Sequence, residues 1–241
     1  MKSIVLAAGY ATRLYPLTLN QPKALLTVGG RPMLDRVLDS LAGVGADQTY
    51  IATNAKFAPH FGQWAATRPD VTVIDDGTMS DEDKLGAIGD IVFVLEQTAI
   101  DEDLVVVAGD NLFSDDLSGF GDACRERNAP VLAVYDVGDL AQMSKYNSIE
   151  TDGDGRITYF EEKPANATST LTGIALYFYP RHVLPLIRQY VAEGNNPDQP
   201  GRLVQWLYPR TDVYTWEVPG TWYDIGSAET LREADEVFSR S

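Results

Sequence analysis

The chain has 241 residues, of which 35 are acidic and 19 are basic, so its formal net charge is −16 at neutral pH. Hydrophobic residues make up 44% and charged residues 22%, as in a globular protein with a sizeable core. The acidity and the lack of a basic cluster exclude nucleic acid as a partner, although a few local cations can still hold a phosphate ligand. The one cysteine, Cys124, excludes a disulfide framework and a cysteine-ligated zinc site.

The apolar segments are too short for a membrane partner. No run approaches the roughly 20 residues that a membrane-spanning helix needs. The apolar segment that follows Met1 is too short and too strand-like for a secretory leader. We therefore expect a cytoplasmic protein, with one large α/β domain or two small ones.

The first half of the chain alternates short apolar runs with amphipathic stretches. Strands are predicted at residues 4–7, 49–53, 71–75, 104–108 and 131–135, and helices at 33–41, 57–67, 85–96 and 115–127. This alternation is typical of parallel strands joined by right-handed helical crossovers, that is, of an open α/β sheet. Ligands bind beyond the carboxyl ends of such strands, so we expect chemistry in the loops after Ala7, Asp75, Ala108 and Tyr135.

The pattern changes in the second half. Residues 147–151 and 156–161 flank Asp152-Gly153-Asp154-Gly155, which predicts a β-hairpin. Further strands are predicted at 171–179 and 213–217, and helices at 181–192, 202–208 and 227–238. Ser227 is a good N-cap for the last helix, but Thr230 in place of glutamate predicts an incomplete capping box. An antiparallel insertion after a parallel sheet predicts two lobes around one cleft.

The loop after the first strand has the composition of an anion-binding loop. Ala7, Ala8 and Gly9 let backbone N–H groups approach a ligand, and Arg13 and Lys23 add positive charge. The loop matches neither the P-loop pattern nor Gly-x-Gly-x-x-Gly. From spacing alone, a turn with two surface cations is an equally good interpretation.

Residues 7–23 resemble the signature of the sugar-1-phosphate nucleotidylyltransferases, which is roughly Gly-x-Gly-Thr-Arg-Leu-x-Pro-x-Thr followed by Pro-Lys. The matching residues are Gly9, Thr12, Arg13, Leu14, Pro16, Thr18, Pro22 and Lys23, whereas Ala11 replaces the second glycine. The resemblance implies an open, mostly parallel α/β sheet of the Rossmann-like GT-A type, with a smaller antiparallel sugar-binding lobe. It also implies a single domain over residues 1–241, in which about 1–115 bind the nucleotide and about 116–241 form the sugar-binding half and the closing helix.

Two further segments resemble the metal-binding motifs of this family. Gly109-Asp110-Asn111 follows a buried strand, and Trp222-Tyr223-Asp224-Ile225-Gly226 resembles the family's Trp-x-Asp-x-Gly close. The resemblance implies that Asp110 and Asp224 bind Mg²⁺, which typically takes one or two carboxylates plus substrate phosphates and waters. Taken alone, each aspartate would be an ordinary turn or helix-approach residue.

Three segments resemble the sugar side of the family's site. Glu162-Lys163-Pro164 resembles a Glu-Lys-Pro motif, which implies that Lys163 binds the sugar phosphate and Glu162 the sugar hydroxyls. Thr172 and Gly173 resemble the strand that lines the sugar pocket, and Asn147 stands where a glycine usually meets a sugar hydroxyl. That departure leaves the identity of the sugar open.

The segment that would contact the base is less specific. Leu85-Gly86-Ala87 resembles the family's Leu-Gly-Thr, which implies that Gly86 packs against the base. Asp81 stands where thymidylyl- and uridylyltransferases often carry glutamine. A carboxylate only accepts hydrogen bonds, so Asp81 suits the amino group of cytosine or guanine. A solvated acidic loop is an equally good interpretation, so the base stays open.

The resemblance implies attack by a sugar-1-phosphate oxygen on the α-phosphorus of an NTP, and dTTP or UTP with a hexose-1-phosphate is the best match. This chemistry needs positioning and charge neutralisation, which the resemblance assigns to Arg13, Lys23 and Lys163. The alternatives are a cytidylyl- or guanylyltransferase acting on another phosphorylated acceptor, and a non-catalytic regulatory subunit that binds nucleotide sugars. The length favours a stand-alone transferase, and a homo-oligomer is compatible with the family.

Overall fold

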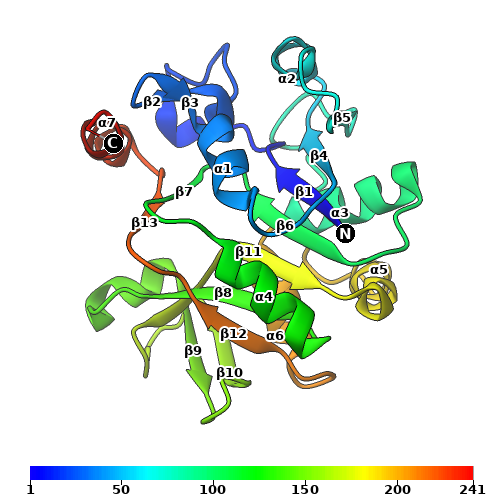
Figure 1. Cartoon of the computed structure of the whole chain (residues 1–241), viewed down its shortest axis with the longest axis vertical. Helices are drawn as coiled ribbons and strands as arrows, with labels where there is room; N and C mark the ends of the chain where they lie inside the picture. Colours follow the sequence, from blue (N-terminus) through cyan, green and yellow to red (C-terminus); the bar gives the residue numbers. More distant parts are fainter. Residues whose placement is uncertain (241) are drawn as a thin grey trace.

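A seven-stranded sheet runs through the centre of the computed structural model, which describes residues 1–240 (Figure 1). Its strands, in spatial order, are β12 (Tyr214–Glu217), β8 (Val131–Asp136), β11 (Leu171–Tyr179), β6 (Leu104–Ala108), β1 (Lys2–Leu6), β4 (Gln48–Thr53) and β5 (Val71–Asp75). Strand β11 is antiparallel to both of its neighbours, and the other pairs are parallel. The predicted mostly parallel α/β sheet is therefore confirmed, and the second-half strands extend the same sheet.

Helices cover both faces of the sheet. The first face carries α1 (Met33–Leu41), α2 (Ala58–Ala65) and α4 (Ser118–Arg127), and the core on this side extends beyond the sheet to α7 (Ala228–Phe238). The second face carries α3 (Ala87–Thr98), α5 (Leu184–Ala192) and α6 (Pro200–Leu207). Alternation along the strands produces the two cores, since Val5 packs with the first set of helices and Ile4 with the second. The result is a three-layer α/β/α arrangement.

Three small antiparallel sheets are added to these layers. They pair β2 (Thr27–Val28) with β3 (Arg31–Pro32), β7 (Asn111–Phe113) with β13 (Trp222–Asp224), and β9 (Asn147–Thr151) with β10 (Ile157–Glu162). The 3-10 turns lie at Thr12–Leu14, Lys23–Leu25, Leu140–Lys145 and Arg181–Val183. The sequence did not predict β7 and β13, because strands of three residues are too short to show a period.

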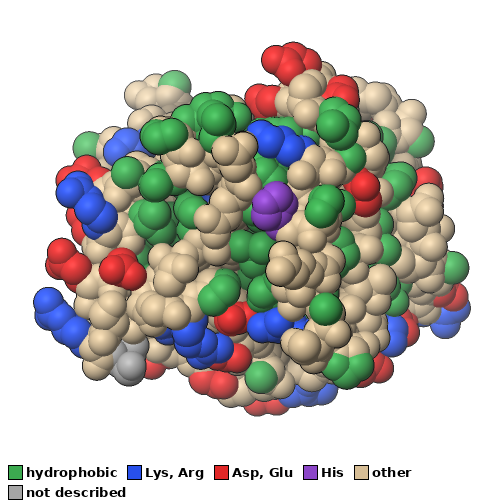
Figure 2. All heavy atoms as spheres, turned by 90° about the horizontal axis from the view of Figure 1, so that it is seen from above, with side chains coloured by type: hydrophobic (Ala, Val, Ile, Leu, Met, Phe, Trp, Pro, Cys, Tyr) green, Lys and Arg blue, Asp and Glu red, His purple; other side chains and the backbone are tan. Residues whose placement is uncertain are grey.

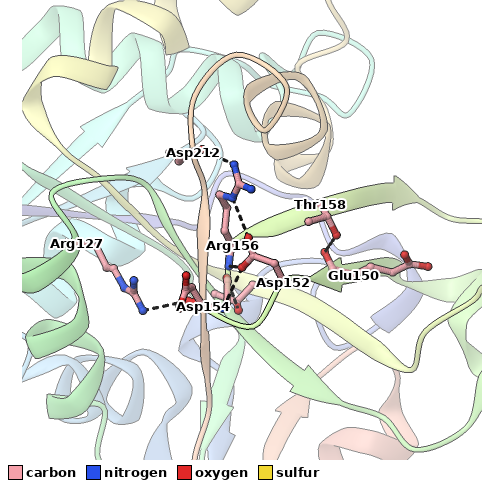
Figure 3. Close-up of polar contacts among 9 residues, drawn as sticks. Arg127, Glu150, Asp152, Asp154, Arg156, Thr158 and Asp212 are labelled. Atoms are coloured by element: carbon pink, nitrogen blue, oxygen red, sulfur yellow. Dashed lines mark hydrogen bonds and ion pairs between the residues drawn. The ribbon is translucent and has the colours of Figure 1, made fainter.

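The predicted β9–β10 hairpin is confirmed, and its turn is held by charged side chains (Figure 3). Asp152 accepts hydrogen bonds from the backbone N–H groups of Asp154 and Arg156 at 3.1 and 3.0 Å. The Arg156 guanidinium pairs with Asp152 at 3.0 Å and with Asp212 at 3.1 Å. These contacts fix the hairpin turn beside the segment that leads into β12.

The last helix differs from expectation at its start. The Ser227 side chain accepts a hydrogen bond from the Thr230 N–H, and the Thr230 hydroxyl accepts one from the Ser227 N–H, both at 3.1 Å. The capping box is therefore complete, and the prediction that it would be incomplete is wrong. A threonine hydroxyl is close enough to replace the usual glutamate carboxylate.

The surface charges and the helix lengths agree with what the composition predicted. On the face in Figure 2, Lys and Arg side chains are scattered among Asp and Glu and form no basic stripe. Among residues 1–240, none of the helices has both the length and the apolar character that crossing a membrane requires.

Candidate functional site

The carboxyl ends of β1 and β6 lie side by side where the strand order reverses, because the chain runs from β1 to β4 and β5 on one side before returning to β6 on the other. The Gly109 N–H donates to the Leu6 carbonyl at 3.0 Å and holds the two strand ends together. A cavity of about 180 Å³ opens here, lined by Leu6, Ala7, Gly9, Ala11, Lys23, Ala24, Gly109 and Asp110. This is the position at which open α/β sheets bind their ligands.

The loop after β1 is anchored at both ends. The buried Asn54 amide donates to the Ala8 carbonyl at 2.7 Å, and the buried Thr18 hydroxyl donates to the Ala11 carbonyl at 2.8 Å. Ala11 adopts the left-handed conformation, with φ +49°, where the related signature has glycine. That conformation costs an alanine about 1–2 kcal/mol. The loop is thus held in a strained turn that leads directly into Thr12 and Arg13.

Two aspartates reach the same cavity through the small β7–β13 sheet. Asp224 pairs in register with Asn111, which directly follows Asp110. A cavity of about 380 Å³ beside the first is lined by Gly9, Tyr10, Ala11, Thr12, Arg13, Leu14, Lys23, Asp81, Lys84, Asp110, Asp224 and Gly226. The two carboxylates, although far apart in sequence, therefore line one cavity with Arg13 and Lys23.

The charges in this cavity are coupled. The Lys23 ammonium forms an ion pair with Asp110. Burial raises the pKa of Asp224, and the negative charge of Asp110 raises it further, whereas Lys23 and Arg13 oppose the shift. A divalent cation between the aspartates would relieve their repulsion, so the donor set fits Mg²⁺. Within residues 1–240 no group of three His, Cys, Asp or Glu side chains is suited to a metal, so substrate phosphates and waters would have to complete its coordination.

A third cavity of about 160 Å³ adjoins the larger one and shares Gly9, Asp81 and Lys84 with it. Its lining consists of Leu6, Ala8, Gly9, Asp81, Lys84, Gly86, Ala87, Asp90 and Asp198. The predicted base-contacting residues Asp81 and Gly86 therefore lie on one cavity, next to the cluster of charges.

Gly86 also has a structural role. Its φ is +80°, and a Cβ there would lie 2.8 Å from the Asp198 Cα and from the Pro197 carbonyl oxygen. That carbonyl accepts a hydrogen bond from the Ile88 N–H at 2.8 Å, in the first turn of α3. Only glycine allows the segment before α6 to pack this closely against the start of α3.

The sequence missed three residues of this cavity. Lys84 bridges Asp81 and Asp198 at 3.3 and 3.1 Å. Asp90 interrupts an apolar stretch of α3 and is 5% exposed, and that break in the helical pattern was a usable signal. Nothing in the sequence near Asp198 indicates that it lies at this cavity.

The predicted sugar-side residues fall into two groups. The Asn147 side chain accepts from the Gly173 N–H at 2.6 Å and from the Thr172 hydroxyl at 3.2 Å, and it donates to the Gly173 carbonyl at 3.0 Å. The Asn147 amide thus links β9 to β11. It is already engaged, and Thr172 is fully buried.

The second group is at the end of β10. The Glu162 Oε2 atom is buried and has no hydrogen-bond partner, and burial raises the pKa of this carboxyl. Lys163 has a left-handed φ of +51° and its side chain is exposed. Lys163 does not line the three cavities at the ends of β1 and β6.

An α/β sheet with paired carboxylates and cations at the point where its strand order reverses is an arrangement suited to a nucleotide and a divalent cation. Residues 2–240 match the family model described as nucleotidyl transferase, and the chain belongs to this family.

The chain is similar in sequence to two curated proteins with sugar-1-phosphate nucleotidylyltransferase names. The chain is 31% identical over 231 residues to a Sulfolobus acidocaldarius protein named "Putative mannose-1-phosphate guanyltransferase", covering 94% of this chain and 60% of the relative. It is 25% identical over 241 residues to a glucose-1-phosphate thymidylyltransferase of Streptomyces antibioticus, covering 98% of this chain and 66% of the relative.

The solved structure of a UDP-glucose pyrophosphorylase complexed with UDP-glucose has a TM-score of 0.82 at 21% identity, with 99% of this chain and 98% of that chain covered. This likeness confirms the fold. The chain spans 60%, 66% and 54% of the length of the first three curated relatives that it matches.

Proposed function

We propose that the chain transfers a nucleotidyl group from an NTP to a sugar-1-phosphate and forms an NDP-sugar and pyrophosphate. One observation carries this proposal: Arg13, Lys23, Asp110 and Asp224 converge on one cavity at the ends of β1 and β6. A polyphosphate needs cations and a metal-binding pair in one place, and this cavity supplies them in a chain whose net charge is −16. The names of the curated relatives, which are sugar-1-phosphate nucleotidylyltransferases, support the same reaction class.

The charged residues have distinct roles in this proposal. Arg13, on the turn after the strained loop, presents a planar cation to the triphosphate and to the charge that develops at the α-phosphorus. Lys23 neutralises phosphate oxygens and holds Asp110 in place. Asp110 and Asp224 would hold Mg²⁺, which supplies charge neutralisation on the phosphates when bound.

The residues that would bind the sugar-1-phosphate lie on and next to β10 and β11. In this proposal the Glu162 carboxyl, whose buried Oε2 atom has no hydrogen-bond partner, accepts hydrogen bonds from sugar hydroxyls, and the exposed Lys163 binds the sugar phosphate. Asn147 acts as a positioning residue that fixes Gly173, because its amide is occupied. In this proposal the nucleotide lies mainly on about residues 1–115, joined by Asp198 and Asp224, and the sugar on about 116–241. The cytoplasmic location stays a prediction.

The experiment is a matrix of pyrophosphate-release assays that crosses GTP, UTP, dTTP, CTP and ATP with several hexose-1-phosphates in the presence of Mg²⁺. We expect release with at least one pair and its loss on chelation of the metal. The variant Asp110→Asn should lose release, whereas Asp122→Asn, an exposed carboxylate on α4, should keep it. The absence of release with every pair would contradict the proposal.

A further inference from the structure

Asp90 has no place in the chemistry proposed above, yet it lines the cavity beside the phosphate site. It lies in the first turn of α3 and is 5% exposed. Its Oδ1 atom is buried and has no hydrogen-bond partner. Such an acceptor costs stability unless a donor reaches it, and because Asp90 lines the cavity, that donor can come from a ligand as well as from a neighbouring acid.

A second carboxyl lies behind Asp90. The Oδ2 atom of Asp76 is also buried without a partner, whereas its Oδ1 atom accepts from the N–H and the hydroxyl of Thr78 at 2.7 and 2.8 Å. Burial, and then the charge and hydrogen bond of Asp76, raise the pKa of Asp90 to about 8. With a pKa of about 8, Asp90 keeps its proton at neutral pH, and this proton is hydrogen-bonded to Asp76.

This proton determines what the pair offers to the cavity. Because the proton is engaged between Asp90 and Asp76, the remaining oxygen lone pairs of Asp90 can only accept hydrogen bonds. The other charged groups around the cavity are Asp81, Lys84 and Asp198, and the lysine is committed to these two aspartates. The cavity is therefore rich in acceptors.

We propose that Asp90, supported by Asp76, is a specificity-determining residue that accepts hydrogen bonds from the N1–H and the N2 amino group of guanine. Guanine presents two adjacent donors on this edge. Uracil and thymine place one N–H between two carbonyls, and cytosine and adenine place a ring acceptor beside the amino group. Of these bases, only guanine can present two adjacent donors to the Asp90 oxygen without also placing one of its own acceptors against that oxygen. This inference rests on the proposed function and departs from the expectation of dTTP or UTP.

The test compares kcat/KM for the five nucleotides, with the best sugar-1-phosphate, in the native enzyme, in Asp90→Leu and in Asp90→Asn. We expect the native enzyme to prefer GTP over UTP by at least about 10-fold, and Asp90→Leu, which removes the acceptor, to reduce that ratio by about 10- to 100-fold, as for the loss of a buried hydrogen-bonded base contact. Asp90→Asn is the matched control, because its amide can donate to Asp76 and its carbonyl still accepts from guanine, so it should fold and keep the preference. Glu82→Gln removes a charge from the neighbouring loop without lining the cavity and should leave the ratio unchanged.

Equal or better use of any other nucleotide by the native enzyme would overturn the inference, as would an unchanged ratio in Asp90→Leu. The native comparison does not depend on the variant. Calorimetric binding of GTP and UTP separates this inference from the proposed function. Selective binding of GTP without turnover contradicts only the proposed reaction, and turnover without a preference for GTP contradicts only the role of Asp90.

Discussion

Replacing Gly86 with alanine tests whether this residue is required for packing as well as for the base cavity. With φ +80° and ψ 160°, Gly86 lies in a region that essentially only glycine adopts, and a residue with a Cβ loses about 1–2 kcal/mol there. The new Cβ would also lie 2.8 Å from backbone atoms of Pro197 and Asp198, so that segment must move. Its movement removes the hydrogen bond between the Ile88 N–H and the Pro197 carbonyl, worth about 1 kcal/mol. We expect a total loss of about 2–3 kcal/mol in the free energy of unfolding.

Urea unfolding at neutral pH, followed by circular dichroism, measures this loss, and thermal unfolding should show a fall of about 5–10 °C for a chain of this size. Gly62→Ala is the control, because a Cβ there has nothing within 4 Å and α2 gains about 0.5–1 kcal/mol from the exchange. Native stability in Gly86→Ala, with a loss of nucleotide affinity only, would refute the packing argument.

Three further predictions concern the loop, the carboxyl pair and the reaction. Ala11→Gly should raise the free energy of unfolding by about 0.5–1 kcal/mol, because glycine relieves the strain at φ +49°, and a lower thermal midpoint would contradict this. Since the pKa of Asp90 is raised to about 8 in the folded chain, its contribution to stability is complete below pH 4 and is lost as the pH rises towards 8. Asp90→Asn should therefore flatten the dependence of unfolding free energy on pH between 5 and 8, and parallel profiles would refute the raised pKa. Arg13→Ala should lower turnover at least about 100-fold with unchanged unfolding, and near-normal pyrophosphate release would remove Arg13 from the mechanism.

Local patterns were sufficient for much of the fold. The runs at 104–108 and 131–135 predicted β6 and β8, because strands buried on both faces are continuously apolar. The paired Asp-Gly residues predicted the β9–β10 turn. The start of α7 was less predictable, since only the side-chain geometry shows that Thr230 completes the capping box.

The family motifs located the charged residues of the site but not their contacts. Arg13, Lys23, Asp110 and Asp224 were all predicted, and all four line one cavity. The motifs did not show that the Asn147 side-chain amide hydrogen-bonds to the Gly173 backbone, because that contact depends on how β9 packs against β11.

The sequence by itself therefore determined the fold class and the family, and it predicted Arg13, Lys23, Asp110 and Asp224, since these depend on periodicity, on turn-forming residues and on short contiguous motifs. The tertiary structure alone decided which distant residues meet. It brought Asp224 opposite Asn111, placed Asp198 against the start of α3 and set Asp90 beside Asp76. Such contacts join segments that are far apart in the chain, and no local pattern encodes their distance. The overall charge of −16 is thus compatible with a phosphate site, because folding gathers a few cations and aspartates at one edge of the sheet.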